Sequence, residues 1–151
     1  MHTKYILIIL GEPYSTFSEI IGKYFKKRKK QNKKIIIIGS KKLLLKQLKN
    51  LNCLFKLNEI NDVKHAKKNI INIIDIKFNF TKIYSQVSNK SNDYIKKCFD
   101  VSIKILNNNK CILINGPITK KTFLNKKYLG ITEYLAKKTK IKNEVMLIYN
   151  D

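Results

Sequence analysis

Short runs of consecutive apolar residues, each ended by glycine, proline or polar residues, constrain the fold of this chain more than any other feature. They lie at residues 5–10 (YILIIL), 35–38, 70–76, 112–114 and 145–149. Runs that are apolar at nearly every position are typical of strands buried on both faces, as in a parallel sheet. We therefore expect five buried strands, with residues 112–114 forming a buried strand end.

Segments in which apolar residues recur at helical spacing separate these runs. Ser40, a favoured N-cap residue, precedes one of them, and the clearest occupies residues 91–107. Residues 54–68 are ambiguous and fit a short strand and a loop, whereas residues 78–90 are predicted to form a loop. The expected helices lie at residues 17–25, 41–51, 91–107 and 132–138. This alternation predicts a layered α/β/α fold with a largely parallel sheet, and no shift in composition marks an internal domain boundary.

The net charge of +22, on 151 residues, raises nucleic acid as a possible partner. Two observations argue against it. Arg28 is the only arginine among 32 basic residues, although arginine is preferred for contacts with bases and phosphates. The lysines are also spread along the chain beside many Ile and Asn residues, as A/T-rich codons would produce. The dense run at residues 23–34 is interpreted as a solvated helix end and loop, with a polyanion-binding patch as the alternative.

The cysteines and histidines suggest neither a disulfide framework nor a metal site. Cys53, Cys98 and Cys111 are far apart, which fits a reduced, cytoplasmic protein. His65 lies in a lysine-rich loop and is expected to be exposed. No glycine-rich nucleotide loop, signal peptide or membrane-spanning run is recognised. Two carboxylates near strand ends remain open: Glu12 could be functional, and Asp75 could be functional or a capping residue.

Residues 111–135 contain the most suggestive chemistry. Asn115-Gly116-Pro117 ends an apolar run, Lys120 and Lys121 follow, and Gly130-Ile131-Thr132-Glu133 opens a helix. In open α/β sheets, ligands bind outside the carboxyl ends of the strands. A lysine, a threonine hydroxyl and free helix N–H groups at that edge could bind an anion. The alternative is a simple strand–turn–helix junction with solvated lysines.

Two segments resemble the 4-hydroxythreonine-4-phosphate dehydrogenase family of pyridoxal phosphate biosynthesis. Gly11-Glu12-Pro13, followed by Glu19-Ile20, resembles the family's opening GDP/GEP signature. LINGPITK, then LGITEYLAKKT and VMLI, resembles its GPINK, GHTE and VMM segments in order and spacing. The resemblance spans essentially all of this chain but only the N-terminal half of the family's usual length.

The resemblance implies an isocitrate- or isopropylmalate-dehydrogenase-like α/β/α fold that works as a homodimer. It implies NAD-dependent oxidation and decarboxylation of 4-phosphooxy-threonine, with a divalent metal (Zn, Mg or Co) polarising the hydroxyl. Thr132 matches a substrate-contacting threonine and Lys120 matches a lysine at the rim of the site. Ile131 stands where the family has a substrate-binding histidine. The metal-binding histidines and most of the NAD site would lie beyond Asp151, so no residue of this chain is assigned to either.

We therefore expect residues 1–151 to be the N-terminal half of a two-domain dehydrogenase, with exposed sheet edges and no activity alone. Its partners would be a small phosphorylated substrate, a second copy or a complementing C-terminal half, and no membrane. Two other functions stay open. One is a dehydrogenase of a related phosphorylated hydroxy acid, which Ile131 would allow. The other is a small nucleic-acid-binding module, whose affinity should fall about a thousandfold from low to moderate salt.

Overall fold

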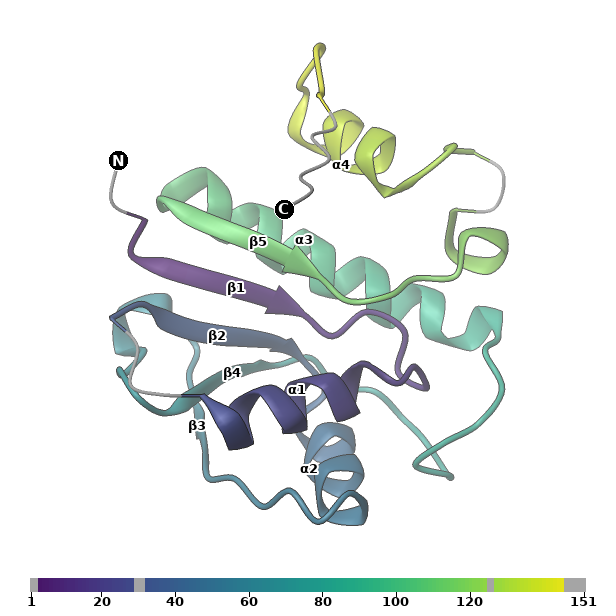
Figure 1. Ribbon diagram of the computed structural model, residues 1–151. Coiled ribbons are helices and arrows are strands. Elements are labelled where there is room, and N and C mark those ends of the chain that lie inside the picture. Colours follow the sequence, from purple (N-terminus) through teal and green to yellow (C-terminus); the bar gives the residue numbers. More distant parts are fainter. Residues whose placement is uncertain (1–2, 29–31, 125–126, 146–151) are drawn as a thin grey trace, which may run out of the picture.

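The computed structural model describes residues 3–28, 32–124 and 127–145. Its centre is a five-stranded sheet in the order β3-β4-β2-β1-β5, and every pair of neighbouring strands is parallel (Figure 1). The strands are β1 (Tyr5–Ile9), β2 (Lys34–Gly39), β3 (Leu57–Glu59), β4 (Ile71–Asp75) and β5 (Cys111–Asn115). The predicted α/β fold with a parallel sheet is confirmed.

Helices cover both faces of the sheet. Successive strand residues point to opposite sides, so both sets of side chains are buried beneath helices. On one face, α1 (Phe17–Lys27) and α2 (Lys41–Asn50) pack on Ile8, Ile37 and Ile73. On the other face, α3 (Asn92–Asn108) packs on Leu7 and Ile38, and α4 (Ile131–Thr139) joins the same core through Tyr134 (Figure 1). The strands in the middle of the sheet are therefore apolar at consecutive positions.

The expected burial of residues 112–114 is wrong. Ile112 and Ile114 are 40% and 44% exposed, because β5 is an edge strand and neither α1 nor α2 reaches across it. Two apolar residues of the helix predicted at residues 17–25 are also exposed, Ile20 at 55% and Tyr24 at 40%. Exposed apolar surface at a sheet edge agrees with the expectation for a half-length chain.

The uncertain segments resolve into short elements. Residues 54–68 contain β3 and the single turn η1 (Val63–His65), and residues 78–88 form a loop before the turn η2 (Asn89–Ser91). The strand expected at residues 145–149 falls almost wholly outside the described residues, and Val145 itself is not in a strand. Among the described helices, none combines the length and apolar character needed to cross a membrane.

Candidate functional site

The carboxyl ends of β1 and β5 meet at the point where the direction of chain connection reverses. From β1 the chain passes through α1 to β2 on one side, and α3 later carries it across the other face to β5. Ligands of open α/β sheets bind beside such a reversal point. The loop that follows each of these two strands is therefore the natural place to look for a site.

The crevice between these two loops is closed by direct backbone contact. The Gly116 N–H donates to the Ile9 carbonyl (2.7 Å), and the Glu12 N–H donates to the Pro117 carbonyl (2.8 Å). Gly11 has a φ of +71°, and a Cβ there would collide with the Pro117 carbonyl oxygen. A Cβ at Gly116 would likewise collide with the Leu10 carbonyl oxygen. The glycines allow this close approach, so a ligand must lie outside the two loops.

Glu12 is a buried carboxylate that ties two segments together. Glu12 is only 3% exposed. Its Oε2 accepts a hydrogen bond at 3.0 Å from the hydroxyl of Ser91, which lies at the start of α3. Burial raises the pKa of the Glu12 carboxyl above its usual value, although the hydrogen bond from Ser91 opposes that rise. Glu12 Oε1 has no hydrogen-bond partner among the described residues. The carboxylate therefore joins the β1 loop to α3 rather than facing solvent.

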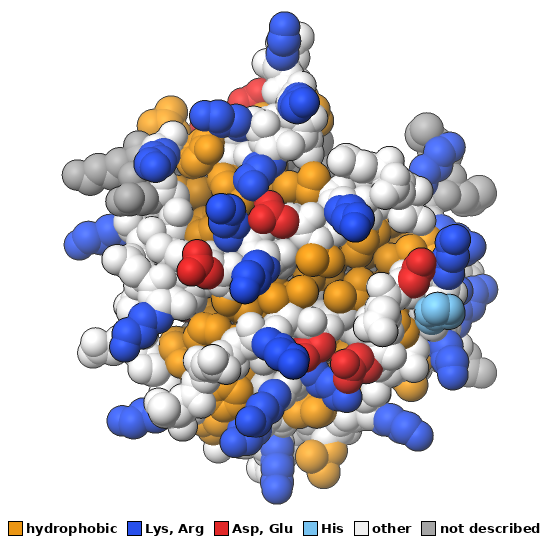
Figure 2. Space-filling view, turned by 180° about the vertical axis from the view of Figure 1, so that it is seen from behind, with side chains coloured by type: hydrophobic (Ala, Val, Ile, Leu, Met, Phe, Trp, Pro, Cys, Tyr) orange, Lys and Arg blue, Asp and Glu red, His pale blue; other side chains and the backbone are white. Residues whose placement is uncertain are grey.

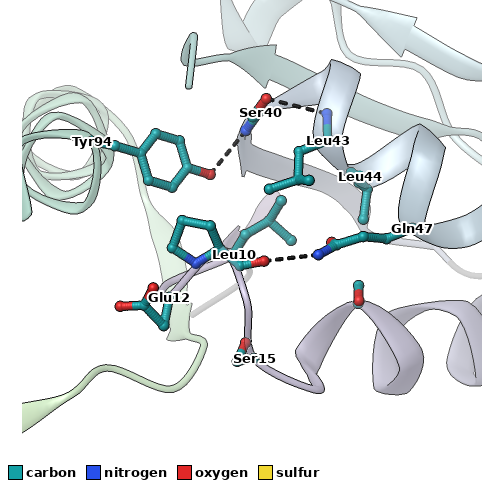
Figure 3. Close-up of a pocket in the computed structure, with 10 residues that line it drawn as sticks. Leu10, Glu12, Ser15, Ser40, Leu43, Leu44, Gln47 and Tyr94 are labelled. Carbon is teal, nitrogen blue, oxygen red and sulfur yellow. Dashed lines mark hydrogen bonds between the residues drawn. The ribbon is translucent and has the colours of Figure 1, made fainter. Parts of the chain in front are cut away.

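A small cavity beside Glu12 has room for about one water molecule, about 10 Å³ (Figure 3). Polar side chains close it: Gln47 donates to the Pro13 carbonyl (2.8 Å), and the Ser40 N–H donates to the Tyr94 hydroxyl (2.9 Å). This space is too small for a phosphorylated substrate. It is lined by Leu10, Glu12, Pro13, Ser15, Ser18, Ser40, Leu43, Leu44, Gln47 and Tyr94.

The second open carboxylate, Asp75, caps a helix. Its Oδ1 accepts a hydrogen bond from the Lys41 N–H at 2.8 Å, at the first residue of α2. Ser40 caps the same helix by accepting from the Leu43 N–H, as its sequence position predicts. Of the two readings left open by the sequence, the structure supports the capping role of Asp75.

The three residues assigned by resemblance lie on two elements that follow β5. Lys120 is exposed at the start of the wide turn η3 (Lys120–Leu124), whereas Thr132 is half-buried in the first turn of α4. Ile131 is partly buried and packs against the core on the α3 side of the sheet. In the described part of the chain, the Lys120 side chain makes no hydrogen bond or ion pair with either α4 residue.

An aromatic cluster holds α4 in place and was not anticipated from the sequence. The ring of Tyr134 meets those of Phe99, Phe123 and Tyr128 edge-on, with centroids 5.3–5.4 Å apart. Phe99 belongs to α3 and Phe123 to η3, so the cluster positions the first turn of α4 relative to both. Four aromatic residues scattered over 36 positions give no local pattern that could have revealed it.

Other candidate reactive groups carry no site. Cys98 is completely buried, and burial raises the pKa of its thiol to about 12, so it is not a nucleophile at neutral pH. His65 is exposed, as predicted. In the described segments, no three His, Cys, Asp or Glu side chains gather where they could hold a metal ion. The described residues therefore do not fit a metal site.

The lysines do not gather into one basic surface on the side turned away in Figure 1. Figure 2 shows them spread over that side, with acidic and apolar side chains between them. Three of the basic side chains are paired with Glu19, Glu59 and Asp100. The distribution on this side does not favour nucleic-acid binding there.

Comparisons with known proteins identify the relatives of this fold. The model of the family "Pyridoxal phosphate biosynthetic protein PdxA" matches residues 31–151. The structure superimposes on the 4-hydroxythreonine-4-phosphate dehydrogenase of Klebsiella pneumoniae with a TM-score of 0.79 and 20% identity, covering 99% of this chain and 47% of that one. The superposition on the 4-hydroxythreonine-4-phosphate dehydrogenase of Burkholderia phymatum has a TM-score of 0.76 and 20% identity, and it covers 95% of this chain and 46% of that one. No curated protein gives a significant match. This chain thus spans about half the length of the solved structures that it resembles.

Proposed function

Because this chain belongs to the pyridoxal phosphate biosynthetic protein PdxA family, we propose that residues 1–151 form the N-terminal half of an NAD-dependent 4-hydroxythreonine-4-phosphate dehydrogenase. The observation that carries the proposal is the family match over residues 31–151, which includes the whole stretch from β5 to α4. The superposition on dehydrogenases of that name supports the same fold. The proposed reaction is oxidation and decarboxylation of 4-phosphooxy-threonine in the cytoplasm.

Thr132 and Lys120 are the residues of this chain that we propose to bind substrate. Thr132 lies in the first turn of α4, whose unpaired N–H groups and dipole favour an anionic group. Its hydroxyl can donate to a phosphate or carboxylate oxygen. Lys120 is exposed on η3 and can supply a positive charge at the rim. Together these groups would hold and orient the substrate but would not move a proton.

We propose that NAD and a divalent metal ion (Zn, Mg or Co) bind through a C-terminal half, which also completes a homodimer. NAD would accept the hydride when bound. Neither group is assigned to side chains of this chain, so the contribution derived for residues 1–151 is limited to substrate binding.

Substitution of Thr132 tests this assignment. The test enzyme is the 151-residue chain co-expressed with the part of the Klebsiella pneumoniae enzyme that the superposition leaves uncovered. Thr132→Val should raise KM for 4-phosphooxy-threonine at least tenfold, since one hydrogen bond to a charged group contributes about 1.5–3 kcal/mol. Lys120→Gln should raise KM less, because Lys120 is exposed. Lys142→Gln, another exposed lysine, is the control, and equal KM values in all four proteins would refute the assignment.

A related phosphorylated hydroxy acid is a second candidate substrate, and Ile131 favours it. An apolar side chain packed against the core replaces the hydrogen-bond donor that the family resemblance places there. If the family substrate is used, Ile131→His should raise kcat/KM for 4-phosphooxy-threonine in the same co-expressed enzyme. If the second candidate is right, the unmodified enzyme should prefer another phosphorylated hydroxy acid, and Ile131→His should lower that preference.

A further inference from the structure

The turn at the carboxyl end of β5 contains a chemically labile pair, Asn115-Gly116, and no other asparagine of this sequence precedes a glycine. The backbone nitrogen of a glycine can attack the side-chain carbon of a preceding asparagine, because glycine has no side chain to hinder the approach. The side-chain amide leaves as ammonia, which takes up the Gly116 N–H proton, and a cyclic succinimide forms. Water then opens either carbonyl of the ring and leaves aspartate or isoaspartate.

The fold holds Asn115 in a conformation that opposes this reaction. Asn115 is exposed, but it is the last residue of β5 and pairs with Ile9 of β1. Ring closure requires rotation about the backbone of Asn115, which a paired and extended strand does not permit. The side-chain amide of Asn115 also donates to the Gly116 carbonyl at 3.2 Å, and this hydrogen bond is lost when ammonia leaves.

The attacking nitrogen, that of Gly116, is restrained as well. Its N–H donates to the Ile9 carbonyl at 2.7 Å, so the nitrogen must give up this hydrogen bond before it can react. Gly116 is buried, and it lies so close to the Leu10 carbonyl that a Cβ would not fit. The peptide between Asn115 and Gly116 can therefore rotate only when the loops after β1 and β5 separate.

We propose that Asn115 is a deamidation site controlled by the contact between the ends of β1 and β5, which protects it when closed and exposes it to reaction when open. The rate in the folded chain then falls about tenfold for each ~1.4 kcal/mol of free energy needed to open the contact. Among the described residues β5 has a neighbouring strand on one side only, so opening breaks the pairing with β1 alone (Figure 1). This site does not depend on the dehydrogenase assignment.

Deamidation also prevents the contact from closing again. Isoaspartate carries the main chain through its Cβ and Cγ, which adds a backbone carbon between residues 115 and 116. The Gly116 N–H then no longer meets the Ile9 carbonyl in the register of the β1–β5 pair. The modified chain should therefore unfold at a lower concentration of denaturant than the unmodified chain.

Peptide mapping by mass spectrometry, after incubation at mildly alkaline pH with and without denaturing guanidinium chloride, tests the proposal. In the denatured chain Asn115 should deamidate before any other asparagine, and in the folded chain it should react at least about tenfold more slowly. Gly11→Ala keeps the Asn-Gly pair, but its Cβ collides with the Pro117 carbonyl oxygen, so this variant should deamidate faster without denaturant. Gly130→Ala, at a φ of −159° that suits any residue, is the control and should react at the unmodified rate.

Hydrogen exchange of the Gly116 amide in the unmodified chain is a second measurement, which does not require Gly11→Ala to fold. Denaturant concentrations below the unfolding transition that speed this exchange should speed deamidation of Asn115 in proportion. Equal deamidation rates in the folded and denatured chains would overturn the proposal, as would earlier reaction of another asparagine in guanidinium chloride. A deamidation rate that does not follow the Gly116 exchange rate would also overturn it, since opening of the contact would then not control the reaction.

Discussion

At the scale of single residues, the closest contact in the candidate site depends on two glycines. Gly11 and Gly116 let the loops after β1 and β5 meet backbone to backbone. The sequence shows that Gly116 follows an apolar strand. It does not show that Leu10, more than a hundred residues earlier in the chain, lies so close to Gly116 that no side chain fits at position 116. That information comes only from the pairing of β1 with β5.

Gly116→Ala should lower the free energy of unfolding by about 2 kcal/mol or more, because the added methyl group collides with backbone that cannot move aside. Gly130→Ala is the matched control. Its φ of −159° suits any residue, and the nearest atom to a new Cβ is the flexible end of Glu133. Urea denaturation measures both, and an equal loss in the two variants would contradict the close approach of the loops.

Glu12 should make stability depend on pH. Its pKa in the folded protein is raised by burial, so the folded state holds this proton over a pH range in which the unfolded chain releases it. The free energy of unfolding therefore falls as pH rises from below the usual glutamate value through the raised one. Glu12→Gln cannot ionise and still offers an oxygen to Ser91.

The Gln variant should therefore match the unmodified chain at the acid end of this range and gain stability relative to it towards neutral pH. Denaturation midpoints across the range measure this difference. A difference that does not change with pH would show that the Glu12 carboxyl has the same pKa in the folded and unfolded states.

At the scale of elements, the sequence located most strands and helices within one or two residues. The central strands follow from apolar runs, and α2 follows from Ser40 and its leucines. The place of β5 at the edge of the sheet was missed, because strand order depends on long-range pairing and not on local composition. Asn72 was also missed: it is fully buried within β4, where its amide donates to the carbonyls of Ile35 and Lys67.

Helix capping distinguishes two positions that look alike in the sequence. Ser40 Oγ accepts the Leu43 N–H at the start of α2, whereas Thr16 makes no side-chain cap at the start of α1. Ser40→Ala should cost about 1 kcal/mol of unfolding free energy, and Thr16→Ala should cost less than about 0.5 kcal/mol. Thermal denaturation measures the loss of unfolding free energy in each variant. An equal loss in the two variants would contradict this difference in capping.

At the scale of the whole molecule, the described residues form a layered sheet in which β5 is an edge strand with exposed apolar side chains. The family resemblance predicted the fold, and the family match and the superpositions confirm it. The candidate substrate residues could be assigned only through that resemblance. Lys120 and Thr132 are twelve positions apart on separate elements, and local chemistry does not show that they act together.

The most direct test of the account is NADH formation from NAD and 4-phosphooxy-threonine, with a divalent metal ion present. The purified 151-residue chain should form none, because it spans only about half the length of the solved dehydrogenases that it resembles. The same chain co-expressed with the C-terminal half of the Klebsiella enzyme should form NADH, and Thr132→Val should reduce the rate at low substrate. NADH formation by the chain alone, or none by the co-expressed pair, would contradict the claim that residues 1–151 are one half of a dehydrogenase.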